Sequence, residues 1–177
     1  MGTKDITKRN QSIYILYNWV TVILWAGFIW WMSSIPKIIL VESDSEVIIK
    51  TVGHMLSFGF LFLLIYRTLL TTFKFKVERL AFWRTRQERT EDAQFVFIVE
   101  TLLLAISILL SVLYAIGDEY HQIFVDGKSA DIKDVLVNSI GILVVALITY
   151  SVPVITEAEV MIVRKLKSKR SKKKKNK

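Results

Sequence analysis

The sequence predicts an all-α integral membrane protein, a four-helix bundle with the N- and C-termini in the cytoplasm. Three observations predict this fold class: four long apolar stretches, a one-sided distribution of Lys and Arg, and a composition with two Pro, seven Gly and no Cys in 177 residues. In lipid every backbone polar group has to be paired inside its own segment, so the apolar stretches should form helices. A chain without Cys has no disulfide framework and no cysteine nucleophile.

Each apolar stretch is about long enough to cross a bilayer, whose hydrocarbon core of about 30 Å needs roughly 20 helical residues. The stretches cover residues 11–36, 51–66, 95–117 and 135–156. We therefore expect a membrane domain of residues 13–156, with helices at about 13–35, 50–70, 95–117 and 134–156. A soluble protein with buried helices is the alternative, and four such stretches in one short chain argue against it.

The distribution of basic residues predicts the orientation of these helices. The N-terminus (residues 1–12), the second connection (residues 71–94, with Arg67 just before it) and the tail (residues 157–177) hold 20 of the 24 Lys and Arg. Because Lys and Arg accumulate on the cytoplasmic side, these three segments should lie inside and the first and third connections outside. We expect a multi-pass protein of the plasma membrane. Glu100, the one acid within the apolar stretches, should extend toward the inner interface.

The inner segments leave smaller questions open. The N-terminal apolar stretch is too long for a signal peptide, so it should be retained as an anchor. The connection 71–94 mixes aromatic and basic residues, and it is either an amphipathic surface segment or a solvated loop. The basic end of the tail, residues 164–177, carries so much of the charge that the rest of the chain has 14 basic and 16 acidic residues. We expect the tail to bind anionic lipid, and we expect no specific nucleic acid partner.

Polar residues gather at the predicted outer ends of the helices. His54 lies near the outer end of the second helix, while Asp134 and Asn138 open the fourth. The third helix ends in four polar residues: Asp118, Glu119, His121 and Gln122. Polar groups in or beside a membrane helix are expensive, so their gathering at one depth indicates a functional site. The alternatives are helix capping for the acids and an interfacial, hydrogen-bonded residue for His54.

Helical spacing places several of these residues on shared faces. Asp118 and Gln122 are four residues apart, as are Asp134 and Asn138, so each pair lies on one side of its helix. Gly141, three residues beyond Asn138, would admit a close approach between helices and bring a partner to that amide. A turn at Asp126–Gly127 should separate the two helices.

These residues resemble the motifs of the VanZ-like family of small bacterial membrane proteins. The matching positions are Asp118, Glu119, Gln122 and Phe124, then Gly127 and Lys128, then Asp134, Asn138 and Gly141, with Lys50, His54 and Phe58 as an earlier motif. Lys128 stands where Arg is usual, and a Lys lacks the bidentate fork of Arg. Asp126 and Met55 also depart from the usual residues. The family is named after a protein linked to teicoplanin resistance, so the resemblance implies a role in the cell envelope and supplies no reaction.

Three functions are consistent with this pattern. The first is an outward-facing binding site for a lipid-linked or cell-wall headgroup, or for a glycopeptide, made of His54, Asp118, Glu119, Gln122, Lys128, Asp134 and Asn138. The second is a membrane enzyme in which His54 and Glu119 act as general base and acid. No cofactor is expected, although a divalent metal at His54, His121, Asp118 and Glu119 is a weak alternative. The third is a small transporter or proton relay, which would need an oligomer because few polar residues lie deeper in the bilayer.

Overall fold

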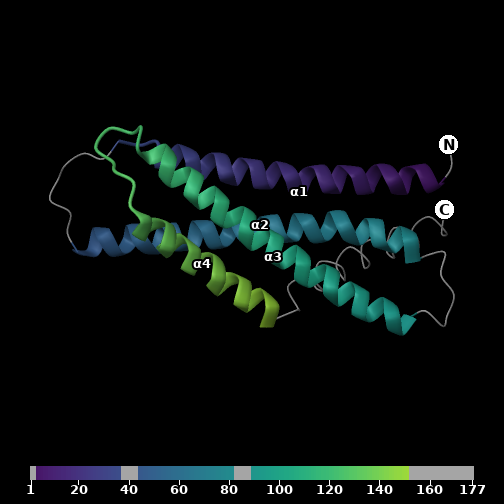
Figure 1. Ribbon diagram of the computed structural model, residues 1–177. Coiled ribbons are helices and arrows are strands. Elements are labelled where there is room, and N and C mark those ends of the chain that lie inside the picture. Colours follow the sequence, from purple (N-terminus) through teal and green to yellow (C-terminus); the bar gives the residue numbers. More distant parts are fainter. Residues whose placement is uncertain (1–2, 37–43, 82–88, 152–177) are drawn as a thin grey trace. The chain divides into compact units, whose positions relative to one another are not determined.

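The structure, a computed structural model, describes residues 3–36, 44–81 and 89–151, and within them the side chains of residues 11–36, 48–73 and 97–151. Its elements are four helices and, in these ranges, no strand: α1 (Thr3–Ser33), α2 (Asp44–Ala81), α3 (Arg89–Gln122) and α4 (Ile132–Ser151) (Figure 1). Each helix contains a segment long and apolar enough to cross a membrane: Gln11–Ser33, Ile48–Phe73, Phe97–Gln122 and Ile132–Ser151. The predicted all-helical class is confirmed, and the side on which the termini lie stays a prediction.

α1, α2 and α3 are longer than the apolar stretches that predicted them. α2 continues to Ala81 and α3 begins at Arg89, so both enter the connection predicted at 71–94. The hydrophobic-length rule marks only the part that can sit in lipid, whereas Lys, Arg and Glu are good helix formers beyond it. The surface character of residues 74–96 and the role of the tail, residues 157–177, lie outside the described side chains.

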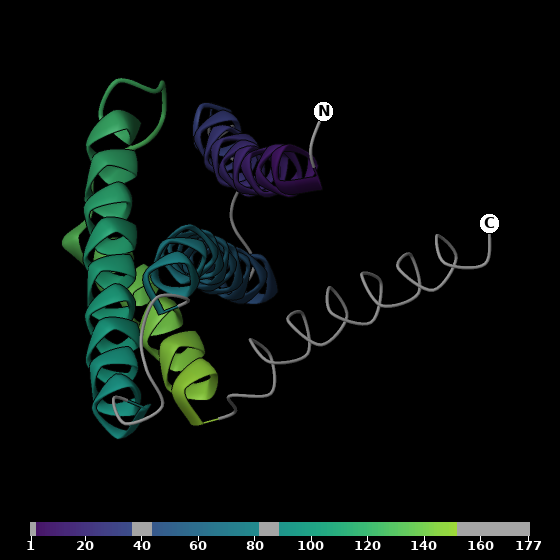
Figure 2. The same cartoon turned by 90° about the vertical axis from the view of Figure 1, so that its right-hand side faces the viewer.

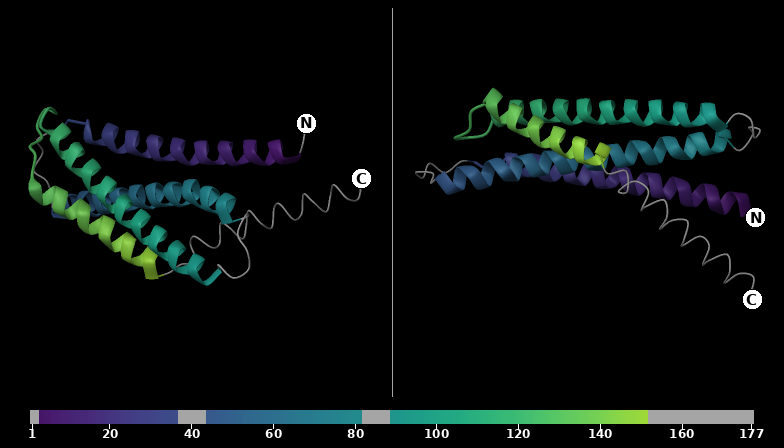
Figure 3. Two further views of the ribbon diagram at one scale, coloured as in Figure 1. Left: turned by 45° about the vertical axis from the view of Figure 1, so that its right-hand side comes forward. Right: turned by 90° about the horizontal axis from the view of Figure 1, so that it is seen from below.

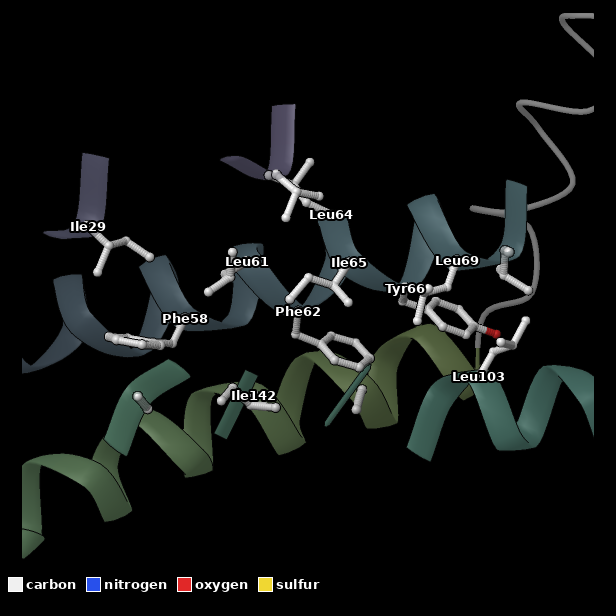
Figure 4. Packing of buried hydrophobic residues seen from close by; sticks show 14 residues of the cluster. Ile29, Phe58, Leu61, Phe62, Leu64, Ile65, Tyr66, Leu69, Leu103 and Ile142 are labelled. Atoms are coloured by element: carbon white, nitrogen blue, oxygen red, sulfur yellow. The ribbon is translucent and has the colours of Figure 1, made fainter. Parts of the chain in front are cut away.

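α2 is the central helix of the packed part. It contacts both α1 and α3, and it lies between α1 and the part of α4 up to Ala146 (Figures 2 and 3). Most of the buried hydrophobic cluster comes from α2. Phe58 and Phe62 point from α2 toward α4, where Ile142 lies (Figure 4).

The other helices expose large apolar side chains. Ile23, Leu24, Leu109 and Leu143 are among those with more than half of their surface exposed. A soluble monomer rarely exposes an apolar surface of this extent, whereas lipid tails cover it without cost. The exposure therefore fits helices that face lipid.

α2 and α4 cross with almost no space between their backbones, as predicted at Gly141. A Cβ added at Gly141 would overlap the carbonyl oxygen of Met55 and lie 2.7 Å from Met55 Cα. A Cβ added at Gly59 would lie 2.7 Å from Val145 Cγ2 and 3.1 Å from the carbonyl oxygen of Gly141. Small residues at a crossing let membrane helices approach closely. This contact fixes the first half of α4 against α2 and so positions the side chains one turn earlier on α4.

Four helix ends meet at one end of the protein. The end of α1, the start of α2, the end of α3 and the start of α4 all lie on the left of Figure 1. We call this region, with the connecting segment 123–131, the polar end. Residues far apart in the sequence are brought together there.

Candidate functional site

A tight connection joins α3 to α4 at the polar end. Backbone N–H groups at its start donate to carbonyls of the last turn of α3, as in Phe124 N to His121 O at 3.0 Å. Gly127 has a positive φ of 74°, a conformation that glycine adopts without strain, and Lys128 N then donates to Val125 O at 3.1 Å. The predicted turn at Asp126–Gly127 is present.

Asp131 caps the start of α4 and is held by Glu119. Its Oδ1 accepts a hydrogen bond from Lys133 N at 2.9 Å, the arrangement of an N-cap residue. Its own N–H donates to Glu119 Oε1 at 2.7 Å. The capping alternative therefore describes Asp131, whereas Glu119, a residue of α3, fixes the position at which α4 begins.

Asp118 joins α3 to the end of α1. Its Oδ2 accepts a hydrogen bond from Ser33 Oγ at 2.7 Å, and a second, longer one from Gln122 Nε2 at 3.3 Å. Asp118 and Gln122 are both buried on one face of α3, as their spacing predicts. Ser33, also buried, had no place among the predicted site residues.

Lys128 reaches across the polar end to the same serine. Its Nζ donates to the Ser33 carbonyl oxygen at 2.8 Å, at the C-terminus of α1, where the helix dipole favours a cation. Burial lowers the pKa of Lys128 from the usual value for lysine, and the neighbouring charge of Lys50 lowers that pKa further. Asp118 and Glu119 lie close enough to oppose this shift.

His54 adds a residue of α2 to this group of side chains. We call the seven predicted residues the polar cluster: His54, Asp118, Glu119, Gln122, Lys128, Asp134 and Asn138. Its half-buried ring interacts electrostatically with Asp118 of α3, with Asp134 of α4, and with Lys50 and Lys128. Asp134 also interacts with Glu119. The structure thus brings together six of the seven residues predicted to bind a ligand.

Asn138, the seventh, lies on the face of α4 that meets α2. It is one turn beyond Asp134 and one turn before Gly141, and Gly141 packs against Met55, the neighbour of His54. The side chain of Asn138 is 2% exposed. Its place on this face puts it at the inner side of the cluster.

Three buried oxygens of the cluster have no hydrogen-bond partner: Asp118 Oδ1, Glu119 Oε2 and Asn138 Oδ1. Asp118 and Glu119 are 1% and 5% exposed, so neither carboxylate is freely solvated. Buried polar atoms are nearly always paired, and an unpaired one costs several kcal/mol in lipid, about 2–7 by transfer measurements. These unpaired acceptors come from two helices, α3 and α4.

His121 lies apart from these residues. Its ring stacks on Trp30 with centroids 3.9 Å apart, and its Nε2 lies 2.9 Å from Ser34 Oγ. Within the part of the chain that the structure describes, no three His, Asp or Glu side chains form a group that could hold a metal ion. The weak metal alternative at His54, His121, Asp118 and Glu119 therefore has no ready-made ligand set in these ranges.

Several buried polar residues within the spans escaped the sequence analysis. Asn18, Thr68, Ser107 and Ser111 are all buried. The three hydroxyls donate to carbonyls one turn earlier on their own helices, at 2.7–2.8 Å, a local bond that short spacing rules could have found. These three hydroxyls therefore have hydrogen-bond partners on their own helices and form no chain across the bilayer. They add no support to the transporter or proton-relay alternative.

The comparison with family models identifies the chain. No curated protein and no solved structure matches it. The model of the VanZ/LLP1 family matches residues 3–155, a span that includes the four helices and every residue of the polar cluster. The chain is therefore a multi-pass membrane protein that belongs to the VanZ/LLP1 family.

Proposed function

We propose that the polar end faces the outside of the plasma membrane and binds the headgroup of a lipid or of a lipid-linked cell-wall intermediate. The observation that carries this proposal is the set of three unpartnered oxygens on Asp118, Glu119 and Asn138. A stable membrane protein tolerates such a cost where a ligand removes it. Family membership supports a role in the cell envelope, and a binder of this kind would modulate susceptibility to teicoplanin-type glycopeptides.

The distribution of basic residues supports the outward orientation. The N-terminus, residues 67–94 and the tail hold 20 of the 24 Lys and Arg, whereas the polar end has Lys50, Lys128 and Lys133. Positive residues favour the cytoplasm, which leaves the polar end outside.

Apolar side chains around the cluster favour a ligand that comes from the membrane. Ile123, Phe124 and Ile132, all at the polar end, expose 52%, 69% and 71% of their surfaces. Tyr120 stacks edge-on against Phe124, with ring centroids 5.4 Å apart. Aromatic and apolar groups at the end of a membrane helix settle at the lipid interface. A lipid headgroup is already present at that depth.

A susceptibility measurement tests the proposal in cells that express the full chain. His54→Ala and Glu119→Ala should return the cells to the teicoplanin susceptibility and envelope composition of cells that lack the protein. His121→Ala is the matched control, because this second histidine stacks on Trp30 outside the cluster. Normal expression with unchanged susceptibility and envelope composition for both cluster variants would count against the proposal.

A second candidate is a membrane enzyme that acts on the same headgroup. The ring of His54 and the unpartnered carboxylate oxygen of Glu119 belong to one cluster, and such a pair can move protons as general base and acid. In that case purified protein would convert a bound lipid to a product of different headgroup mass. Release of unchanged lipid after prolonged incubation would favour binding alone.

A further inference from the structure

We propose that the group bound in the polar cluster is a primary ammonium carried next to a phosphate, as in an ethanolamine phospholipid headgroup. This inference rests on the proposed function and names the class of ligand for the same site. It follows from the chemical type of the unpartnered atoms, from the charges around them, and from the two lysines at the rim.

All unpartnered atoms of the cluster are acceptors. Asp118 Oδ1, Glu119 Oε2 and Asn138 Oδ1 need donors, and the unpartnered buried atoms described in the cluster include no donor. A primary ammonium offers three N–H donors, one for each oxygen. A sugar hydroxyl offers one donor, while phosphates, carboxylates and quaternary ammonium groups offer none.

The charges of the cluster also favour a cation beside the acids. Asp118 and Glu119 are buried, and Glu119 interacts electrostatically with both Asp118 and Asp134. Like charges held close together in a site of low dielectric repel, and a bound cation relieves this repulsion. Among the described residues no group of His, Asp and Glu could hold a metal ion, whereas an ammonium needs only hydrogen-bond acceptors.

Lys50 and Lys128 provide the place for the phosphate. Lys128 Nζ is held at the Ser33 carbonyl oxygen at 2.8 Å, near enough to Lys50 for that charge to lower the pKa of Lys128, and it also interacts with Asp118 and Glu119. A phosphate between the lysines would offset their mutual repulsion and would lie next to the acids. Two carbon atoms separate the ammonium from the phosphate in an ethanolamine headgroup, so one headgroup can meet both sets of charges.

The test compares a lipid that has a primary ammonium with one that has a quaternary ammonium and one that has no amine. Full-length protein in detergent is given an equimolar mixture of phosphatidylethanolamine, phosphatidylcholine and phosphatidic acid, and retained lipid is counted by native mass spectrometry. Because charge-assisted hydrogen bonds to the ammonium are lost in the choline lipid, ethanolamine lipid should be retained about tenfold more. Soluble O-phosphoethanolamine should displace it, and phosphocholine should not.

A pair of variants ties the preference to the cluster. Glu119→Gln keeps the acceptor for Asp131 N but places an NH2 donor at the unpartnered oxygen, so it should abolish the preference for ethanolamine. Glu100→Gln makes the same change on the same helix 19 residues earlier, about 28 Å along the axis, and should leave the preference intact. The wild-type lipid comparison stands even if Glu119→Gln fails to fold.

The outcomes separate this inference from the proposed function. Equal retention of ethanolamine and choline lipids, or a preference that survives Glu119→Gln, would overturn the ammonium assignment and leave headgroup binding in place. Retention of none of the three lipids would also overturn it. That result together with unchanged susceptibility of the cluster variants would remove the proposed function as well.

Discussion

Ser33 Oγ donates a hydrogen bond of 2.7 Å to Asp118 Oδ2 and so joins the last residue of α1 to α3 across 85 positions of sequence. The carbonyl oxygen of the same serine accepts from Lys128 Nζ at 2.8 Å. One residue of α1 therefore contacts two charged residues of the cluster, Asp118 and Lys128. Ser33 therefore positions the side chains of Asp118 and Lys128.

Ser33→Ala should destabilise the protein by about 1–3 kcal/mol. The buried Asp118 Oδ2 would lose its shorter hydrogen bond and keep only the longer one, from Gln122 Nε2. The measurement is the melting temperature of purified protein in detergent. Ser34→Ala is the control, since that hydroxyl lies near His121 on a partly exposed surface and should cost less. Equal losses for the two variants would show that the Ser33–Asp118 bond has no special weight.

Gly141→Ala should separate α2 from α4, because the added Cβ would overlap the backbone of Met55. Overpacking of this kind typically costs about 1–3 kcal/mol, read again as a lower melting temperature. Gly117→Ala is the matched control: a Cβ at Gly117 has nothing within 4 Å, and Ala should stabilise the helix by about 0.5–1 kcal/mol. A neutral Gly141→Ala would mean that the backbones do not meet at this crossing.

The ionisation of Lys128 should respond in opposite directions to two changes. Lys50→Gln removes a charge that lowers the pKa of Lys128, so that pKa should rise, whereas Asp118→Asn removes a charge that raises it, so the pKa should fall. NMR of the dimethylated lysine during a pH titration measures both. Between the lowered pKa of folded Lys128 and the usual 10.5, the unfolded chain binds more protons, so the free energy of unfolding should rise with pH. Below the lowered pKa this contribution should not change with pH. Shifts of the same sign in both variants would contradict the described neighbourhood.

Introduced cysteines test the orientation, since the chain has no native Cys. In intact cells an impermeant thiol reagent should label Ser43→Cys and Ser129→Cys but not Ser168→Cys, as the positive-inside rule predicts. Ser129 is exposed in the connection between α3 and α4. Labelling at position 168 without labelling at 129 would place the polar end in the cytoplasm and remove the outward-facing site.

Much of the fold could be predicted because hydrophobic length is a local property. The four apolar stretches and the close crossing at Gly141 follow from short sequence windows. The continuation of α2 to Ala81 could not be predicted in this way, because a helix beyond the apolar stretch needs no apolar run. Helix spacing placed Asp118 and Gln122 on one face of α3, but it could not tell that Ser33 would become a partner of Asp118.

The same limit explains why neighbouring residues at the end of α3 have different surroundings. His121 and Gln122 are neighbours in sequence, yet His121 stacks on Trp30 while Gln122 reaches Asp118. Successive helical positions differ by about 100°, so the direction of each depends on which helix packs there. Asn18, buried in α1 with both amide atoms unpartnered, gave no motif that would have marked it.

Replacing the two buried asparagines tests the central claim most directly. Asn138 and Asn18 are both buried with unpartnered amide atoms, but only Asn138 belongs to the polar cluster. Asn138→Leu and Asn18→Leu should each raise the melting temperature of lipid-depleted protein, because removing an unpaired buried amide gains about 1–3 kcal/mol. Native mass spectrometry should then show loss of the retained headgroup lipid in Asn138→Leu alone. Retention in Asn138→Leu equal to that of the wild type, or an equal loss in Asn18→Leu, would contradict a headgroup site at the polar end.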